Sequence, residues 1–320
     1  MIRKLGCLTL LAILAGLAFF IVRSSGGSGP DKDVTVVVAQ GSSLKAAARM
    51  LEREGAITSA DRFITYARVF GSSASIKPGE YEVTKGMTAA AVLELLQAGK
   101  TLQRYVAVPE GFPSIMIYDR LMATKYLTGE ITVPAEGSVL PDNYSYVRGE
   151  KRSAVLLRMQ TAMTKSLAEL WENRKPSTVA QSPKEAIILA SIVEKETGKA
   201  SERRKVAGVY SNRIRIGMKL QADPTTIYPV TKGKPLGRRI LKSELSADNG
   251  YNTYAMYGLP VGPIANPGKA SIAAVLNPEP TRALFFVADG TGGHVFADTL
   301  AQHNANVEKW FAIRRGKGEM

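Results

Sequence analysis

The chain has 320 residues, of which 45% are hydrophobic, and it carries a formal net charge of +14. This length suggests about two domains with enough residues for a buried core. One cysteine and two histidines are too few for a disulfide framework or for a zinc site built from several His and Cys ligands. We therefore expect no metal and no cofactor.

The first segment, Leu5–Val22, is an apolar run without a charge. As a helix it would be about 27 Å long, which just spans the hydrocarbon core of a bilayer. Arg3 and Lys4 precede it and place the N-terminus inside. A cleaved signal peptide is the alternative, but Arg23 follows directly and no Ala-x-Ala site closes the run. We expect residues 1–23 to be a single-pass signal anchor in the cytoplasmic membrane, with the body in the periplasm or on the outer face.

A Gly/Ser-rich linker is expected at residues 24–32, followed by a small module at 33–105. The module begins with the order strand, helix, helix, strand. The expected elements are a strand at 33–39, helices at 44–54 and 59–70, a strand at 79–83, a helix at 88–98 and a strand at 102–108. Ser42 or Ser43 caps the first helix, and Gly99 ends the third.

The remaining chain, residues 106–320, is expected to form a larger domain, so that the fold class is α+β. The expected elements are helices at 153–171, 184–193, 202–215 and 300–314, and strands at 219–221, 284–288 and 294–296. Asp289-Gly290 joins the last two strands into a hairpin. The segment 136–146 is rich in turn residues, and 173–182 has the composition of a loop.

The helix that follows Ser182 and Pro183 carries the strongest chemical signal. These two residues fit an N-cap and a first-turn proline, and Gly198 fits the end of the helix. The helix is apolar and leads to two carboxylates, Glu194 and Glu196. A poorly solvated carboxyl group has a raised pKa, which suits a general acid catalyst.

The two carboxylates are not equivalent, because positions two apart on a helix point about 200° away from each other. Glu196 shares the bulky face with Leu189 and Ile192, whereas Glu194 follows Ala190. We therefore favour Glu196 as the acid and expect Glu194 to be solvated. The alternative is that both are solvated charges at a helix end, which is the common fate of a glutamate.

Ordered motifs continue on both sides of this helix end. They are ASIVEKET at 190–197, ASER at 200–203, KVAGVYSN at 205–212, LQADPT at 220–225, YNTY at 251–254, GLPVGPIANPG at 258–268, LFFVADG at 284–290 and GGHVF at 292–296. Together they closely resemble the endolytic murein transglycosylases, bacterial enzymes that cut the glycan strands of peptidoglycan. The resemblance covers roughly residues 33–314. In that family the catalytic glutamate is the second acid of the EKET motif, which falls on Glu196.

The resemblance implies a mechanism with one glutamate instead of the two carboxylates of ordinary glycoside hydrolysis. Glu196 would protonate the glycosidic oxygen between N-acetylmuramic acid and N-acetylglucosamine. As a carboxylate it would then take the proton of the muramyl C6 hydroxyl, so that a 1,6-anhydro ring forms. Thr197 either forms a hydrogen bond near the acid or caps the helix end. Asp223, as a second carboxylate, is the remaining route to a true muramidase.

Aromatic and amide side chains after this helix are candidates for sugar binding, because aromatic faces pack on the C–H surface of sugars and amides pair with hydroxyl and acetamido groups. The candidates are Tyr251, Asn252, Tyr254, Gln221, Asp223, Asn266 and His294. For the tyrosines the alternative is a loop anchored by buried rings. For His294 the alternative is a hydrogen bond that satisfies its own hairpin.

The resemblance also implies partners. The module at 33–105 looks like the LysM-like modules of the family, which bind amino-sugar polymers, although it could equally be a spacer. A basic body outside the membrane would concentrate near lipid head groups and the carboxylates of peptidoglycan, so nucleic acid is not expected. Synthases of nascent strands are candidate partners.

The alternative function is a non-catalytic glycan-binding or scaffold protein of the cell-wall machinery. Turnover of purified glycan distinguishes this function from that of a lytic enzyme.

Overall fold

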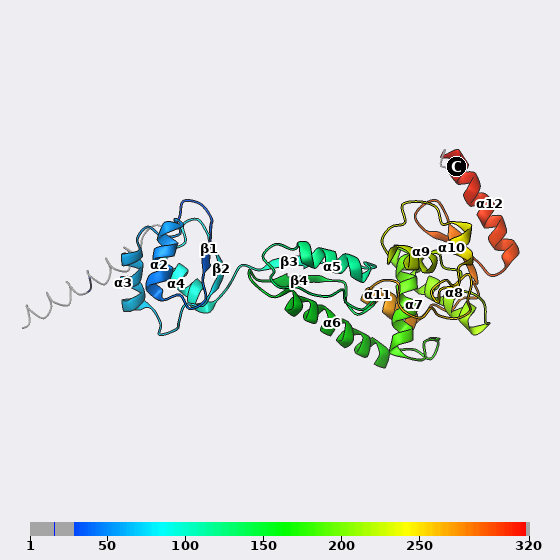
Figure 1. Cartoon of the computed structure of the whole chain (residues 1–320), viewed down its shortest axis with the longest axis horizontal. Coiled ribbons are helices and arrows are strands. Elements are labelled where there is room, and N and C mark those ends of the chain that lie inside the picture. Colours follow the sequence, from blue (N-terminus) through cyan, green and yellow to red (C-terminus); the bar gives the residue numbers. More distant parts are fainter. Residues whose placement is uncertain (1–15, 17–28, 318–320) are drawn as a thin grey trace, which may run out of the picture. The chain divides into compact units, whose positions relative to one another are not determined.

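The computed structural model describes residue 16 and residues 29–317, and its mixture of helices and short sheets is that of an α+β protein (Figure 1). The chain forms two compact units. The first contains the chain up to Arg104 together with Ser145–Gly149, and the second contains Tyr105–Tyr144 and the chain from Glu150 onward. Each unit has its own hydrophobic core.

The first unit begins with the predicted order strand, helix, helix, strand. Its elements are β1 (Val34–Val38), α2 (Leu44–Arg53), α3 (Ala60–Phe70), β2 (Gly79–Val83) and α4 (Ala89–Ala98). The two strands pair antiparallel, from Val34 opposite Val83 to Val38 opposite Gly79. Ser43 is the N-cap of α2, and Gly99 ends α4 in the left-handed region at φ 71°. These local signals explain why the helix bounds agree with the predicted ones within about two residues.

The beginning of the described chain is packed against the first unit. Pro30 is buried, and its carbonyl accepts a 2.9 Å hydrogen bond from the backbone N–H of Gly86. A Cβ on Gly29 would lie 2.3 Å from the carbonyl oxygen of Met87, so only glycine allows this approach. Residues 29 and 30 of the predicted linker therefore pack on the first unit, whereas residues 24–28 lie outside the described residues.

Within the described part of the chain, every helix is too short or too polar to cross a bilayer. The predicted span Leu5–Val22 lies, apart from residue 16, outside the described residues. The signal anchor therefore stays a prediction.

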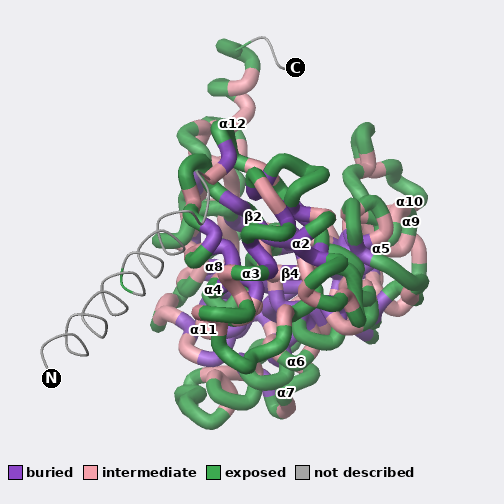
Figure 2. The backbone as a smooth tube through the Cα atoms, turned by 90° about the vertical axis from the view of Figure 1, so that its left-hand side faces the viewer, coloured by how far each residue is buried: buried purple, intermediate pink, exposed green. Residues whose placement is uncertain are grey.

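The second unit holds most of the helices. They are α5 (Ser114–Ala123), α6 (Arg152–Glu172), α7 (Pro183–Glu196), α8 (Arg203–Arg215), α9 (Asp223–Thr231), α10 (Lys242–Ser246), α11 (Lys269–Leu276) and α12 (Leu300–Gly316). A short 3₁₀ helix, η1, spans Ala200–Glu202. None of the residues of α12 is buried (Figure 2), and the helix packs on the hairpin that precedes it.

Two short sheets complete the described fold. β3 (Arg104–Ala107) pairs with β4 (Asn143–Tyr146), which lies within the segment predicted to be rich in turns. β5 (Phe285–Ala288) and β6 (His294–Ala297) form the predicted antiparallel hairpin.

Helix α7 is the centre of the second core. The Ser182 hydroxyl accepts a 3.2 Å hydrogen bond from the N–H of Glu185, and Pro183 occupies the first turn, as predicted. The eight residues from Ala186 to Val193 are all buried, and the helix packs against α8 and α11. A helix that is apolar on all sides is a core helix. The core therefore fixes the position of the carboxylates at its end.

One prediction after α8 is wrong, and one helix was missed. Residues 219–221 do not form a strand, and Gln221 has a positive φ of 50°. Helix α9 was not predicted, and it contains two prolines, Pro224 and Pro229. Pro224 lies in the first turn, where a helix needs no backbone N–H, so it is compatible with the helix.

Candidate active site

A pocket of about 440 Å³ lies where the end of α7 meets α8, the start of α9, β5 and α12. Its lining residues are Glu196, Tyr210, Arg213, Gln221, Asp223, Tyr254, Phe285, Phe286, Leu300, His303 and Asn304. Four of the residues proposed from the sequence, Glu196, Gln221, Asp223 and Tyr254, therefore come together. They belong to three separate segments of the chain.

Glu196 is the last residue of α7 and brings a carboxyl group to this pocket. Its Oε1 atom is buried and has no hydrogen-bond partner. Burial and, to a smaller extent, the negative charge of Asp223 raise the pKa of Glu196 to about 7, although a hydrogen bond with Tyr210 and the charge of Arg213 act in the opposite direction. Such a group can donate a proton near neutral pH and take one back as a carboxylate.

Asp223 and Tyr254 form a direct contact at the pocket. The Tyr254 hydroxyl donates a 2.6 Å hydrogen bond to Asp223 Oδ1. The loops that carry the two residues are joined below the surface, because Thr253 accepts hydrogen bonds from the N–H groups of Gln221 (3.2 Å) and Ala222 (3.0 Å). Burial, followed by the bond to Asp223, raises the pKa of Tyr254 above its ordinary value. Tyr254 therefore stays a hydrogen-bond donor.

Tyr210 and Arg213 on α8 were not among the predicted site residues. Both are buried, and Arg213 donates to the carbonyl oxygens of Leu284, at 2.7 Å, and Leu220. Arg213 thus joins α8, the start of the hairpin and the segment before α9. Burial lowers the pKa of Arg213 from its ordinary value. An arginine keeps its charge in proteins, so Arg213 supplies a positive charge near Glu196. The sequence contained a signal for them. Tyr210 and Arg213 are three residues apart, so they share one face of α8, which is buried.

The remaining wall comes from the hairpin and α12. The ring of His303 stacks on Phe285 with 5.2 Å between the ring centroids. Burial and the charge of Arg213 lower the pKa of His303, and its Nδ1 atom is buried without a partner. In the described part of the chain, no group of three or more His, Cys, Asp or Glu side chains could hold a metal ion.

Asn252, proposed as a substrate contact, does not line the pocket. It is buried, and its Nδ2 donates to three backbone carbonyls, those of Glu244, Leu245 and Ala247. Its Oδ1 accepts hydrogen bonds of 3.1 Å from the Thr226 hydroxyl and 3.0 Å from the Tyr254 N–H. The amide group is therefore fully used in shaping the loop that presents Tyr254.

Asn266 and Tyr251 also lie outside the lining. Asn266 is buried, and its Nδ2 is 3.0 Å from each of three acceptors, including a carboxylate oxygen of Glu136. The ring of Tyr251 packs on Tyr228 with centroids 4.9 Å apart. This is the alternative of a loop anchored by a tyrosine, which the sequence left open for Tyr251.

His294 and Thr197 serve the surrounding structure. His294 Nδ1 lies 2.8 Å from Glu202 Oε2, and its backbone N–H donates to Glu202 Oε1 at 3.2 Å. This pair fixes the hairpin to η1. Thr197 is the buried C-cap of α7, and its hydroxyl accepts a 3.1 Å hydrogen bond from the N–H of Lys199. Neither residue lines the pocket.

The expectation that Glu194 is solvated is wrong. Its side chain is only 5% exposed, lies 3.5 Å from Arg203 Nη2 and accepts a 2.8 Å hydrogen bond from the N–H of Gly268. The helical geometry was correct, since Glu194 and Glu196 do not share the pocket. The start of α8 and the loop before α11 cover the face that carries Glu194.

The chain is similar to known proteins in sequence and in fold. The family model described as the YceG-like family matches residues 36–309. An endolytic murein transglycosylase of Bacillus subtilis (strain 168) is 29% identical over 316 residues, which cover 89% of this chain and 86% of that protein. A protein of the same name from Streptococcus pneumoniae serotype 2 (strain D39 / NCTC 7466) is 26% identical, covering 92% of this chain and 64% of that protein.

Among solved structures, the crystal structure of a yceG-like protein from Listeria monocytogenes is similar to this chain. The TM-score is 0.52 at 27% sequence identity, covering 86% of this chain and 99% of that one. Since the family model covers most of the sequence, from the first strand to the last helix, the chain belongs to the YceG-like family.

Proposed function

We propose that this chain is a lytic transglycosylase that cuts peptidoglycan strands internally, between N-acetylmuramic acid and N-acetylglucosamine. The observation that carries the proposal is Glu196, a carboxyl group at the end of a core helix that lines a pocket and has a pKa raised to about 7. The relatives named endolytic murein transglycosylase support the same substrate.

The proposed reaction uses Glu196 twice. In its neutral form it donates its proton to the glycosidic oxygen, the bond from that oxygen to the muramyl C1 breaks, and positive charge develops at C1. The Glu196 carboxylate then takes the proton of the muramyl C6 hydroxyl while O6 bonds to C1. The products are a 1,6-anhydro-muramyl end and a new N-acetylglucosamine end. No water is consumed, and Glu196 is again protonated.

The neighbouring side chains have properties that suit these steps. Asp223, oriented by Tyr254, supplies negative charge opposite the developing positive charge at C1. Tyr210 and Arg213 favour the carboxylate form of Glu196, which is needed after the first proton transfer. Phe285 and its neighbour Phe286 offer ring surface for packing against sugars, and Gln221 offers an exposed amide.

The proposal includes the N-terminal part of the chain. Residues 1–23 would anchor the protein in the cytoplasmic membrane, and the LysM-like module predicted at 33–105 would bind glycan or act as a spacer. The apolar run Leu5–Val22 and the basic charge of the chain support this location near nascent strands.

The function is tested by turnover of purified peptidoglycan. The wild-type chain should release fragments, and Glu196→Gln should be slower by roughly 10²–10⁴-fold because the only general acid is lost. Glu169→Gln on the exposed side of α6 is the matched control and should keep wild-type activity. Binding of glycan by a wild-type chain without turnover would instead support the scaffold function.

A further inference from the structure

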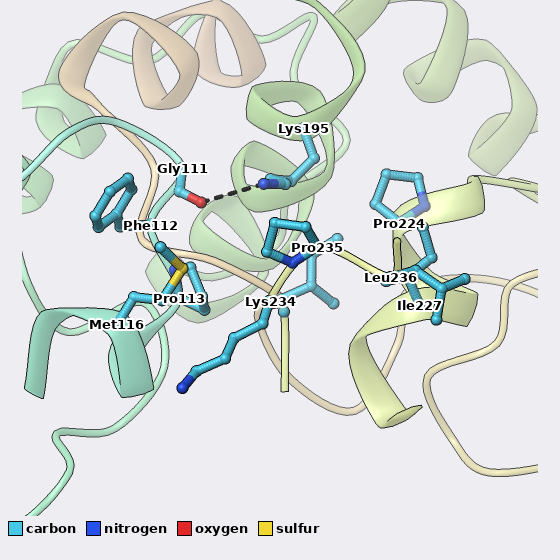
Figure 3. A pocket seen from close by; sticks show the side chains of 12 residues that line it. Gly111, Phe112, Pro113, Met116, Lys195, Pro224, Ile227, Lys234, Pro235 and Leu236 are labelled. Carbon is cyan, nitrogen blue, oxygen red and sulfur yellow. Dashed lines mark hydrogen bonds between the residues drawn. The ribbon is translucent and has the colours of Figure 1, made fainter. Parts of the chain in front are cut away.

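Figure 3 shows a second pocket, which has a volume of about 390 Å³. Lys195 and Pro224 line it, whereas their chain neighbours Glu196 and Asp223 line the first pocket. Adjacent Cα atoms are about 3.8 Å apart. A substrate whose scissile bond lies at Glu196 therefore has this second pocket within reach of a short substituent.

The walls of the second pocket are apolar and closely packed. They include Phe112, Pro113, Met116, Ile227, Leu236 and Ile264. The segment after α9 lies directly on the start of α5, because a Cβ on Gly233 would be 2.7 Å from the Cβ of Pro113. Pro113, Pro224 and Pro235 restrict the backbone around the opening (Figure 3). A pocket with such walls is formed before the ligand arrives, which lowers the entropic cost of binding.

The charge of this pocket comes from Lys195. Its Nζ reaches toward the carbonyl oxygen of Gly111 at 3.4 Å, a long hydrogen bond (Figure 3). Among the described residues, no carboxylate lies within ion-pair distance of Lys195. The other lysine of the lining, Lys234, is paired with Asp119 at 2.8 Å. The pocket thus combines an apolar interior with one ammonium group available to an anion.

We infer that the second pocket binds the peptide stem of the muramyl residue whose glycosidic bond is cut, with Lys195 pairing with a carboxylate of the stem. This inference rests on the proposed function. The stem leaves the muramyl ring through its lactyl group and carries both small apolar side chains and carboxylates. A sugar ring would need hydroxyl partners around its edge, and these walls are mostly carbon. The chemistry of the pocket therefore fits the stem better than a further sugar.

This assignment gives the second pocket a role in specificity. The two sugars of the strand alternate, and only the muramyl residue carries a peptide. A stem bound at Lys195 would set the register of the strand, so that the muramyl side of the bond faces Glu196. Strands without peptides would lose this selection.

Binding tests the inference without turnover. The full chain with Glu196→Gln is titrated calorimetrically with a peptidoglycan tetrasaccharide that carries its stems, and with the same tetrasaccharide after amidase has removed them. We expect tighter binding of the stem-bearing ligand. Adding Lys195→Met should weaken that binding about three- to tenfold, since one charge-assisted hydrogen bond is lost, and leave the stripped ligand unaffected. Lys195→Glu should weaken it more, by repulsion.

Lys165→Met on α6 is the matched control, because Lys165 is 78% exposed and outside the pocket. Equal affinity for the two ligands, or an equal effect of Lys195→Met on both, would overturn the inference. Kinetics separate it from the proposed function. Cleavage of both ligands at equal kcat/KM by the wild type would overturn the inference alone, whereas selective binding without any cleavage would support it and contradict the proposed function.

Discussion

Tyr254 donates a 2.6 Å hydrogen bond to Asp223, and both residues line the pocket that contains the Glu196 carboxyl. The bond holds a negative charge near a buried acid. Burial and this charge together raise the pKa of Glu196 to about 7. The protonation state of Glu196 thus depends on three segments that are distant in sequence.

Replacing Asp223 should change the pH dependence of the reaction. Only protonated Glu196 can start the reaction, so kcat/KM should fall as pH rises through its pKa. Asp223→Asn removes a charge that raises this pKa. The alkaline limb of the pH profile, where kcat/KM falls, should therefore move to lower pH. The measurement is kcat/KM on purified glycan between pH 5 and 9 or so. Asp61→Asn on α3, an exposed site in the other unit, should leave the limb in place. A limb unchanged by Asp223→Asn would contradict the coupling.

The Glu196→Gln variant should be more stable than the wild type at alkaline pH. The folded pKa of Glu196 is about 7 and its ordinary value is 4.5, so between these values the native state holds a proton that the unfolded state lacks. The free energy of unfolding of the wild type should then fall across this window by on the order of 3 kcal/mol. Glutamine does not titrate.

Urea unfolding of wild type and Glu196→Gln at pH 5 and pH 8, or close to these values, checks this prediction. The advantage of the variant should grow with pH. A difference in stability that stays constant over this range would mean that the Glu196 pKa is not raised by folding.

Glu194→Gln should affect stability more than chemistry. The change removes the charge 3.5 Å from Arg203 but keeps an oxygen for the N–H of Gly268. We expect a loss of about 1–3 kcal/mol in the free energy of unfolding, with kcat little changed. Glu169→Gln, which breaks an exposed pair with Lys165, should cost below about 0.5 kcal/mol. Loss of turnover in Glu194→Gln but not in Glu196→Gln would exchange their assigned roles.

Much of the site could be predicted where the signal is local. Ser182 and Pro183 define the start of α7 through capping, and the spacing of Glu194 and Glu196 puts them on different faces whatever surrounds the helix. The environment of Glu194 could not be predicted in this way. Its partners, Arg203 and the N–H of Gly268, reach it only through tertiary packing.

The same limit explains the other differences. Residue type alone suggested sugar contacts for Asn252 and Asn266, since an amide that binds a sugar and one that binds a backbone loop look alike in sequence. Their hydrogen bonds show the second use. The apolar Leu220 suggested a strand, but it is buried in a segment that has no partner strand. Its carbonyl oxygen instead accepts a hydrogen bond from Arg213.

The predicted membrane anchor can be tested by topology. Arg3 and Lys4 before the apolar run, with no cleavage site after it, predict that a reporter fused after Met320 is active only outside the cytoplasm. The mature protein should keep its N-terminus, as read by Edman sequencing or mass spectrometry. A soluble form beginning near Ser24 would contradict the anchor.

The central claim is that Glu196 alone performs both proton transfers, and the mass of the products tests it most directly. Peptidoglycan strands digested by the full chain should yield fragments ending in 1,6-anhydro-muramyl residues, lighter by one water than the corresponding hydrolysis products. Asp223→Asn should give the same ends, because Asp223 does not activate water in this mechanism. Reducing muramyl ends from the wild type would contradict the account and identify a hydrolase with two carboxylates.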